Sequence, residues 1–448
     1  MSAATALQRR TPRWARLAKL TTLVTVVVGV LVLGWLAWPA KPIAVAPAAQ
    51  AVDLRDPNTI ERGRYLSVLG NCQACHTARG GAPFAGGYAL STPFGTVYGS
   101  NLTPGNSGLG PWSADDFWRA MHHGQGPDGR WLNPAFPYNN TTWVTREDSD
   151  ALYAYFRSLP PAEEAVPEHD VSWPYNTQLA LKAWRTLYFS PGPETPPTPP
   201  TSAARAPEML RGAYLVNGLG HCSACHVPRN ALGGQGDMLG LSGGLIPMQR
   251  WYAPSLLDPA EAGLQSWSIE DIVALFKDGR ARDAIVSGPM AEVVQHSTQH
   301  WTTQDLTAMA TYLRQLPVPA PSTTEKPPAP DTRALTAGGQ QYEQHCAQCH
   351  GPQGEGVKSN GALAYPALAG NRAVTMASPA NLVQIVLNGG FAPATEGHPR
   401  PFGMPPFVLQ LSDSELADVL TYVRTQWGNQ AAPVSALDVQ QLRGPLGR

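Results

Sequence analysis

The motif Cys-x-x-Cys-His occurs three times in this chain, as CQACH at residues 72–76, CSACH at 222–226 and CAQCH at 346–350. These copies use all 6 cysteines among the 448 residues. Two cysteines one helical turn apart can form thioether bonds with the two vinyl groups of one porphyrin, and the adjoining histidine can then bind the iron. The motif therefore predicts three covalently bound haem c groups. Their thioether residues are Cys72, Cys75, Cys222, Cys225, Cys346 and Cys349, and their first axial ligands are His76, His226 and His350.

Other uses of paired cysteines fit the pattern less well. A structural zinc site combines two Cys/His pairs that lie close in sequence, whereas these three pairs lie far apart. A redox-active dithiol needs no following histidine and would not recur three times. Disulfides remain a third interpretation, because the cysteine count is even, but they do not explain the regular spacing.

Length and composition limit the class of protein. A chain of 448 residues is expected to form about three domains. Its 32 basic and 33 acidic residues nearly balance, so no nucleic-acid partner is expected. Only 15% of residues are charged, while 44 prolines and 43 glycines are present. Such a composition favours small, loop-rich domains whose core is partly a porphyrin.

The N-terminus contains an uncharged stretch at 20–40 after a basic segment at 1–19. Because about 20 apolar residues can cross a bilayer and basic flanks stay in the cytoplasm, we expect a single-pass anchor here. The chain would then lie in the bacterial inner membrane, with its haem domains in the periplasm. A cleaved signal peptide is the competing interpretation, with Ala49-Gln50-Ala51 as an A-x-A-like cleavage site.

Three repeats of one helical pattern organise the exported part. Each has a helix before the motif, a second helix that ends at glycine, and a closing amphipathic helix. The sequence therefore predicts an all-α fold of three tandem cytochrome c domains behind one transmembrane helix. The first helices are expected at 61–69, 208–218 and 337–344, the second at 114–124, 269–279 and 380–389, and the closing ones at 149–159, 303–316 and 413–427. The domains are expected at 53–160, 208–317 and 333–430, with a strap and proline-rich linker at 161–207, a second linker at 318–332 and a tail at 431–448.

The second axial ligand of two haems is predicted from matching positions in the repeats. Met290 follows Ser287-Gly288-Pro289, and Met404 lies in FGMPP at 402–406. Both precede the closing helix in a Gly/Pro-rich loop that could hold a thioether over iron. The alternative is that either methionine only fills core space.

The first repeat departs from this pattern, because Phe136 occupies the methionine position and cannot bind iron. We expect His122 to be the sixth ligand of haem 1, with His123 or an open, five-coordinate iron as alternatives. Methionine ligation raises the reduction potential relative to bis-histidine ligation. Haem 1 is therefore expected to have the lowest potential.

Several longer stretches resemble the tri-haem cytochrome c subunits of bacterial membrane-bound periplasmic dehydrogenases. They include TPFGTVYGSNLTP at 92–104, WYAPS at 251–255 and FGMPPF at 402–407. The resemblance implies an electron-transfer subunit, rather than the catalytic subunit, of an oxidoreductase complex. Its electrons would come from the catalytic subunit of a periplasmic dehydrogenase and go to ubiquinone or a downstream cytochrome or oxidase.

The identity of the electron donor stays open between several dehydrogenase classes. MHHG at 121–124 together with AFPY at 135–138 is similar to cytochromes that accompany molybdenum enzymes, which favours a molybdenum–iron–sulfur aldehyde dehydrogenase. A quinoprotein alcohol dehydrogenase or a flavin sugar dehydrogenase is the alternative. No nucleotide-binding or nucleophile motif is found, which favours an electron-transfer subunit without substrate chemistry of its own. A haem enzyme that reacts with peroxide at an open haem 1 is a lesser alternative, because Phe136 leaves room at the sixth position of that iron.

Overall fold

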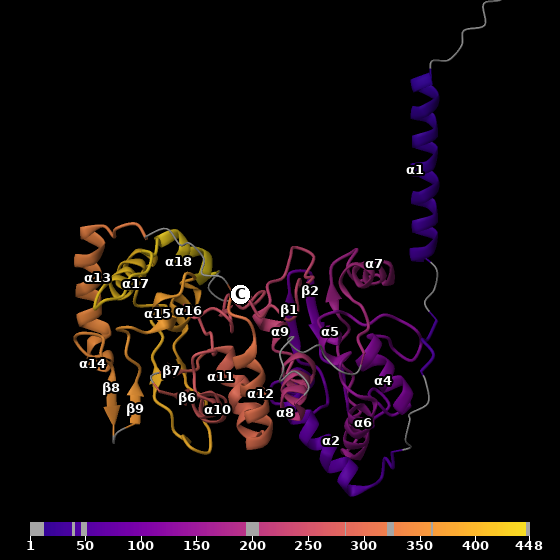
Figure 1. Ribbon diagram of the computed structural model, residues 1–448, viewed down its shortest axis with the longest axis horizontal. Helices are drawn as coiled ribbons and strands as arrows, with labels where there is room; N and C mark the ends of the chain where they lie inside the picture. The colour runs from indigo at the N-terminus through magenta and orange to yellow at the C-terminus, as the bar shows by residue number, and fades with distance from the viewer. Residues whose placement is uncertain are drawn as a thin grey trace, which may run out of the picture.

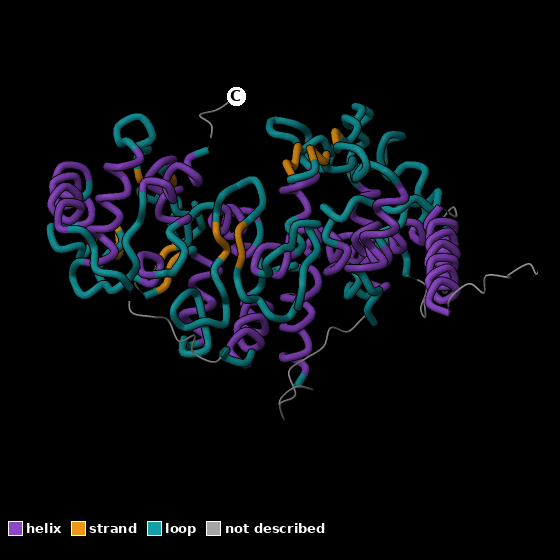
Figure 2. Tube along the Cα trace, turned by 90° about the horizontal axis from the view of Figure 1, so that it is seen from above, coloured by secondary structure: helices purple, strands orange, loops and turns teal. Residues whose placement is uncertain are grey.

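The computed structural model describes residues 13–37, 41–45, 52–193, 206–282, 284–319, 327–359 and 362–444. Within these ranges the chain is mostly helical, and three units lie in a row, with α1 (Arg13–Ala37) standing beside the first (Figures 1 and 2). We call residues 52–193 unit 1, 206–319 unit 2 and 327–444 unit 3. Unit 2 lies between the other two.

Each unit is a set of helices joined by long loops and short antiparallel strands. The predicted helices are present, and a three-stranded sheet in unit 1 and small strand pairs in units 2 and 3 add to the expected all-α fold. Unit 1 contains α2 (Pro57–Leu69), α3 (Cys72–His76), β1 (Ala89–Thr92), β2 (Gly95–Tyr98), α4 (Ala114–His123), α5 (Tyr138–Thr141), α6 (Arg146–Ser158), β3 (Asp170–Val171) and α7 (Gln178–Tyr188). Unit 2 contains α8 (Pro207–Ala213), η1 (Tyr214–Leu219), α9 (Ser223–His226), β4 (Gly244–Leu245), β5 (Tyr252–Ala253), α10 (Ile269–Asp278), β6 (Arg280–Ala281), β7 (Ala284–Ile285), α11 (Pro289–His296), η2 (Thr298–His300) and α12 (Thr303–Gln315). Unit 3 contains α13 (Thr332–His345), α14 (Ala347–His350), β8 (Val357–Ser359), β9 (Ala362–Tyr365), α15 (Arg372–Thr375), α16 (Ala380–Asn388), β10 (Gly390–Phe391), β11 (Gly403–Met404), α17 (Asp413–Thr425) and α18 (Ala436–Arg443).

A close crossing of the first and closing helices recurs in every unit, as α2 on α6, α8 on α12 and α13 on α17. A glycine lies at each crossing, where a Cβ atom would overlap a backbone carbonyl oxygen of the closing helix. Only glycine therefore lets the two backbones approach so closely. The three pairs are Gly63 with Ala151, Gly212 with Ala308, and Gly338 with Asp418.

Units 1 and 2 share a buried polar contact centred on Asp148 of α6. The Arg62 guanidinium donates from Nε to Asp148 Oδ1 over 2.8 Å, within unit 1. The Tyr214 hydroxyl of unit 2 donates to Asp148 Oδ2 over 2.6 Å. Asp148 is 3% exposed, so the carboxylate joins the two units in a site largely removed from water.

The same contact is repeated with the units exchanged. Arg211 Nε donates to Asp305 Oδ1 over 2.8 Å within unit 2, and the Tyr65 hydroxyl of unit 1 donates to Asp305 Oδ2 over 2.8 Å. Units 1 and 2 therefore pack with approximate two-fold symmetry. The repeated sequence Arg-Gly-x-Tyr, at 62–65 and 211–214, supplies the arginine, the crossing glycine and the tyrosine.

Replacing Asp305 with asparagine is expected to lower the stability of this interface by about 2 kcal/mol, because charge-assisted hydrogen bonds are lost. Burial opposes ionisation of Asp305, but hydrogen bonds from Arg211 and Tyr65 lower its pKa below the ordinary 3.8. The stabilisation is therefore fully present above the ordinary pKa of an aspartate, and it is lost as the pH falls through the lowered pKa of Asp305. Thermal unfolding should show a deficit at neutral pH that shrinks in acid. The exposed control Glu61→Gln should unfold like the parent at neutral pH.

Unit 2 contains one more residue between its crossing glycine and its first cysteine than unit 1 does. Its first helix changes from α-helical to π-helical over η1, which accommodates one extra residue per turn. The expected helix at 208–218 therefore consists of α8 followed by η1. This change preserves both the helix crossing and the position of the motif.

Side chains of unit 3 form hydrogen bonds with the backbone of unit 2. Asn381 of α16 accepts from the Tyr252 amide and donates to the Tyr252 carbonyl oxygen, both over 2.8 Å. Arg372 of α15 donates to the carbonyl oxygens of Pro259 and Gly263 in unit 2. Within unit 3, the segment expected as a tail includes α18, which packs on α16 and α17.

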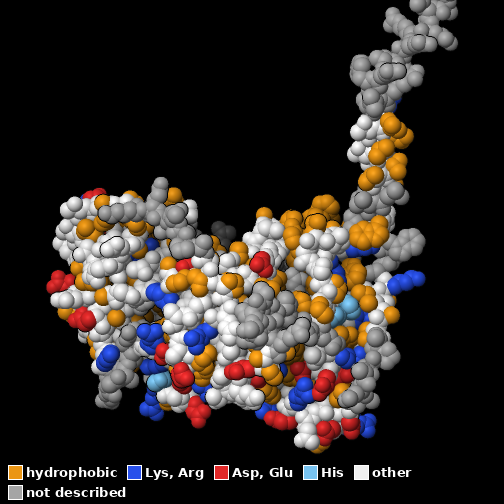
Figure 3. All heavy atoms as spheres, in the orientation of Figure 1, with side chains coloured by type: hydrophobic (Ala, Val, Ile, Leu, Met, Phe, Trp, Pro, Cys, Tyr) orange, Lys and Arg blue, Asp and Glu red, His pale blue; other side chains and the backbone are white. Residues whose placement is uncertain are grey.

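The predicted transmembrane anchor and the single-pass inner-membrane localisation are wrong. Among the described residues, no helix is both long enough and apolar enough to cross a membrane. The cleavage site at 49–51 and residues 1–12 of the basic tail lie outside the described residues. On the face shown in Figure 3, charged side chains gather along the edge of the body away from α1.

Candidate haem-binding sites

The paired cysteines lie on three short helices, α3, α9 and α14, or directly before them. None of the six is joined to another in a disulfide, so the disulfide interpretation is wrong. Among the described residues no three His, Cys, Asp or Glu side chains are grouped to hold a metal ion alone, which argues against zinc. Burial raises the pKa of Cys72 and Cys222 to about 12 and that of Cys346 to about 11. These thiols therefore do not resemble the reactive thiolate of a redox dithiol.

The three motif histidines share one hydrogen-bonding geometry. In each, the ring Nδ1–H donates to a backbone carbonyl oxygen in a loop that follows the motif. The bond fixes the ring orientation and leaves Nε2 without the proton, which is the state that binds iron. The pairs are His76 with Ser100 at 2.7 Å, His226 with Pro254 at 2.7 Å, and His350 with Pro366 at 2.9 Å.

These carbonyl acceptors were not predicted from the sequence. A signal is nevertheless present, because each follows a tyrosine by one or two residues: Tyr98, Tyr252 and Tyr365. Burial lowers the pKa of His76, His226 and His350, which keeps the imidazoles neutral. Neutral rings with a free Nε2 fit the axial position of a haem.

A continuous cavity of about 990 Å³ extends from the motif of unit 2 to that of unit 3. Met290, near the start of α11, and Met404, on β11, both line it. The structure thus brings each candidate methionine into the same space as the motif histidine of its unit. Most other lining residues are apolar, which suits a porphyrin and excludes water. The motif residues on this cavity are Cys222, Cys225, His226, Cys346, Cys349 and His350.

Unit 1 has a different arrangement at the position that corresponds to these methionines. Phe136 packs against the large apolar cluster of units 1 and 2, which includes Met121. His122 instead stacks on Trp118, with ring centroids 4.3 Å apart. Phe136 is therefore part of the apolar packing of unit 1, and His122 lies buried on α4.

The two histidines at the end of α4 are nevertheless unusual. His122 is 9% exposed, and its ring meets the edge of His123 at 4.7 Å. The Nδ1 atoms of both rings are buried without a hydrogen-bond partner in the described part of the chain. A buried ring nitrogen without a hydrogen-bond partner costs free energy unless a ligand or metal engages it. Ligation of the haem 1 iron by His122 would remove this cost and stays a prediction.

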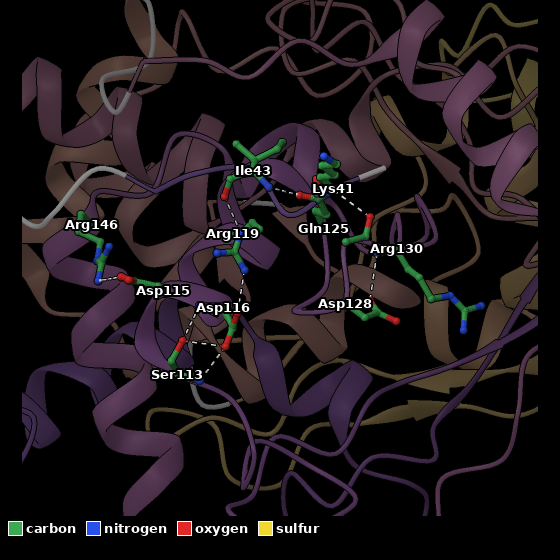
Figure 4. A network of polar contacts seen from close by, with 11 residues as sticks. Lys41, Ile43, Ser113, Asp115, Asp116, Arg119, Gln125, Asp128, Arg130 and Arg146 are labelled. Atoms are coloured by element: carbon green, nitrogen blue, oxygen red, sulfur yellow. Dashed lines mark hydrogen bonds and ion pairs between the residues drawn. The ribbon is translucent and has the colours of Figure 1, made fainter. Parts of the chain in front are cut away.

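A polar network holds α4 in place (Figure 4). Ser113 and Asp116 form a capping box at its first turn, where Arg119 also binds Asp116 at 2.7 Å. Arg119 Nε donates to the Ile43 carbonyl oxygen, and the Ile43 amide donates to Gln125, each over 2.8 Å. The segment at 41–45 is thereby tied to both sides of the helix end that carries the two histidines.

The motifs of units 1 and 2 also lie close together. His221, directly before Cys222, donates from Nε2 to the Gly70 carbonyl oxygen over 3.2 Å. The motif of unit 2 is therefore next to that of unit 1 on one side and shares a cavity with that of unit 3 on the other.

Comparison with known proteins agrees with this geometry. The cytochrome c family model matches residues 210–317 and 335–427, in units 2 and 3. The cytochrome c subunit of a quinone alcohol dehydrogenase from Gluconacetobacter polyoxogenes is 39% identical over 419 residues, covering 90% of this chain and 87% of that protein. The cytochrome c subunit of a gluconate 2-dehydrogenase from Pantoea cypripedii is 38% identical, covering 88% of this chain and 92% of that protein.

A further relative is a much longer protein. This component of a nicotinate dehydrogenase from Pseudomonas putida is 37% identical over 82% of this chain, but the match covers only 30% of its own length. The chain therefore belongs to the family of cytochrome c subunits of dehydrogenase complexes.

Proposed function

We propose that this chain binds three haem c groups and carries electrons from the catalytic subunit of an alcohol or sugar dehydrogenase to ubiquinone or a downstream cytochrome. The observation that carries the proposal is the threefold repetition of a neutral motif histidine whose Nδ1 is bonded to a carbonyl oxygen. When bound, haem c iron gains and loses one electron at a time.

The expected molybdenum aldehyde dehydrogenase is not retained as the favoured partner. The relatives that match along nearly their whole length are subunits of alcohol and gluconate dehydrogenases. A fructose dehydrogenase cytochrome subunit from Gluconobacter japonicus is 33% identical over 86% of this chain. These relatives support the alternative interpretation, a quinoprotein or sugar-oxidising partner.

The residues of this chain have four tasks in that function. The cysteine pairs attach the cofactor covalently, and the motif histidines present Nε2 to the iron in a fixed orientation. Met290 and Met404 complete the coordination in units 2 and 3, and His122 is proposed for unit 1. The apolar lining excludes water, which limits the solvent reorganisation that accompanies each electron transfer.

The position of unit 2 supports a route that crosses the chain in sequence order. Its motif adjoins that of unit 1 through the His221–Gly70 hydrogen bond and shares a cavity with that of unit 3. We infer that electrons pass between units 1 and 3 through unit 2. Deleting the gene and assaying cellular oxidation of alcohols, sugars and aldehydes tests the partner. Loss of aldehyde oxidation alone would contradict the proposed partner.

Replacing His122 with alanine is expected to open the iron of haem 1 to carbon monoxide, with one molecule bound per reduced chain at neutral pH. The parent and the neighbouring variant His123→Ala should bind none, because the sixth position stays filled. Visible difference spectra measure the stoichiometry. Carbon monoxide binding by the parent itself would instead favour the haem-enzyme alternative, which Phe136 at the methionine position supports.

A further inference from the structure

The charged side chains that line the cavity between units 2 and 3 do not balance. Arg280, Arg282 and Arg372 line it, and Glu261 is the one carboxylate among the described lining residues. The Glu261 carboxylate already accepts hydrogen bonds from the Tyr252 hydroxyl and a backbone amide. The described lining residues therefore include more cationic than anionic side chains.

Two of these arginines meet at one aromatic side chain. The guanidinium carbons of Arg282 and Arg372 each lie 5.5 Å from the ring centroid of Trp267, which is 7% exposed. Burial, and after it the proximity of Arg282, lowers the pKa of Arg372. Neither guanidinium forms an ion pair with a carboxylate in the described ranges. Two like charges brought together in a partly buried site are unfavourable unless an anion lies between or beside them.

Hydrogen bonds across the interface between units 2 and 3 hold Arg372 in position. It belongs to α15 of unit 3, but its Nη1 donates to the carbonyl oxygens of Pro259 and Gly263 in unit 2, each at 3.1 Å. Arg282 belongs to the β6–β7 hairpin of unit 2, which also lines the cavity. One arginine from each unit thus approaches the same buried tryptophan.

We propose that Arg282 and Arg372 bind propionate carboxylates of the haems held in this shared cavity, and that they raise the reduction potential there. The inference rests on the proposed function, because it requires haem at the motifs of units 2 and 3. Each haem carries two propionates, and the planar guanidinium is the side chain best suited to bind a carboxylate through two hydrogen bonds.

The proposed contacts have an electrostatic consequence. Reduction adds one negative charge to the haem, so a nearby guanidinium stabilises the reduced form more than the oxidised form. Arg372 also forms hydrogen bonds with unit 2. Its contact with a propionate would therefore make the reduction potential of the bound haem depend on the interface between units 2 and 3. Removing either charge should therefore shift the equilibrium toward oxidised haem.

Potentiometric titration of the full chain, followed in the visible haem bands, tests the proposal with Arg282→Gln and Arg372→Gln. We expect each variant to lower the reduction equilibrium constant of one haem by about tenfold, which is 59 mV for one electron. Arg372→Lys should retain most of the potential, because the positive charge remains. Arg314→Gln, which removes a charge from α12 outside the cavity lining, should titrate like the parent.

Haem content separates failure of this inference from failure of the proposed function. A pyridine haemochrome assay that finds three haems, together with parental potentials in both glutamine variants, would overturn the propionate contacts alone. Absence of haem from the parent would instead overturn the proposed function. Arg282 is exposed, so its variant should fold even if Arg372→Gln does not, and its titration alone can contradict the inference.

Discussion

A chain in which Cys222 and Cys225 are both replaced with alanine is expected to hold two haems and to pass electrons from its dehydrogenase to a quinone more than about tenfold more slowly. The reason is the position of unit 2, whose motif adjoins that of unit 1 and shares a cavity with that of unit 3. Without cofactor in unit 2, units 1 and 3 lose their connection. Quinone reduction by the reconstituted complex measures the effect.

Two comparisons make this result specific. A soluble dye that accepts electrons directly from the dehydrogenase should be reduced at the parental rate, because the dye bypasses this chain. Met290→His keeps both cysteines and should retain three haems and most of the transfer, with a lower potential in unit 2. A two-haem variant that reduced quinone as fast as the parent would show that units 1 and 3 communicate directly.

The second large effect is expected at a helix crossing. Replacing Gly338 with alanine should destabilise unit 3 by about 3 kcal/mol, since the new Cβ atom would overlap the carbonyl oxygen of Asp418 and lie 2.9 Å from the Cβ atom of Tyr422. Helix propensity alone predicts the opposite sign, a gain of about 1 kcal/mol for alanine over glycine. Thermal unfolding of the haem-loaded chain therefore distinguishes packing from propensity.

A matched control is available in unit 2. A Cβ atom at Gly236 would meet nothing within 4 Å, so Gly236→Ala should unfold like the parent. An equal or higher melting temperature for Gly338→Ala would mean that α13 and α17 do not cross as closely as described. The corresponding glycines of the other units, Gly63 and Gly212, should respond in the same way.

Local sequence patterns predicted the helices of each unit well, because the residues that begin and end a helix lie within a few positions of it. The second helix of unit 1 was expected at 114–124 and is found as α4, which ends where Gly124 adopts a left-handed conformation. The closing helix of unit 1 begins earlier than expected, at Arg146, because Thr145 caps it. Met290 and Met404 were identified from their Gly/Pro-rich loops, and both line the cavity of their motifs.

Features that depend on contacts between units could not be predicted from the sequence of a single repeat. The tyrosines Tyr65 and Tyr214 bond to aspartates of the neighbouring unit, and the carbonyl acceptors of the motif histidines come from distant loops. The contacts of Arg372 could not be predicted, because its partners Trp267 and Gly263 lie about a hundred residues away in another unit. Periodicity reports burial within a helix, and it contains no information on which unit covers which.

Intact mass spectrometry of the denatured chain, combined with a pyridine haemochrome assay, tests the central claim most directly. We expect a polypeptide that keeps its red colour after extraction with acidified acetone and has a mass increased by three haems. A mass increased by fewer than three haems, or a colour that the solvent removes, would contradict the account.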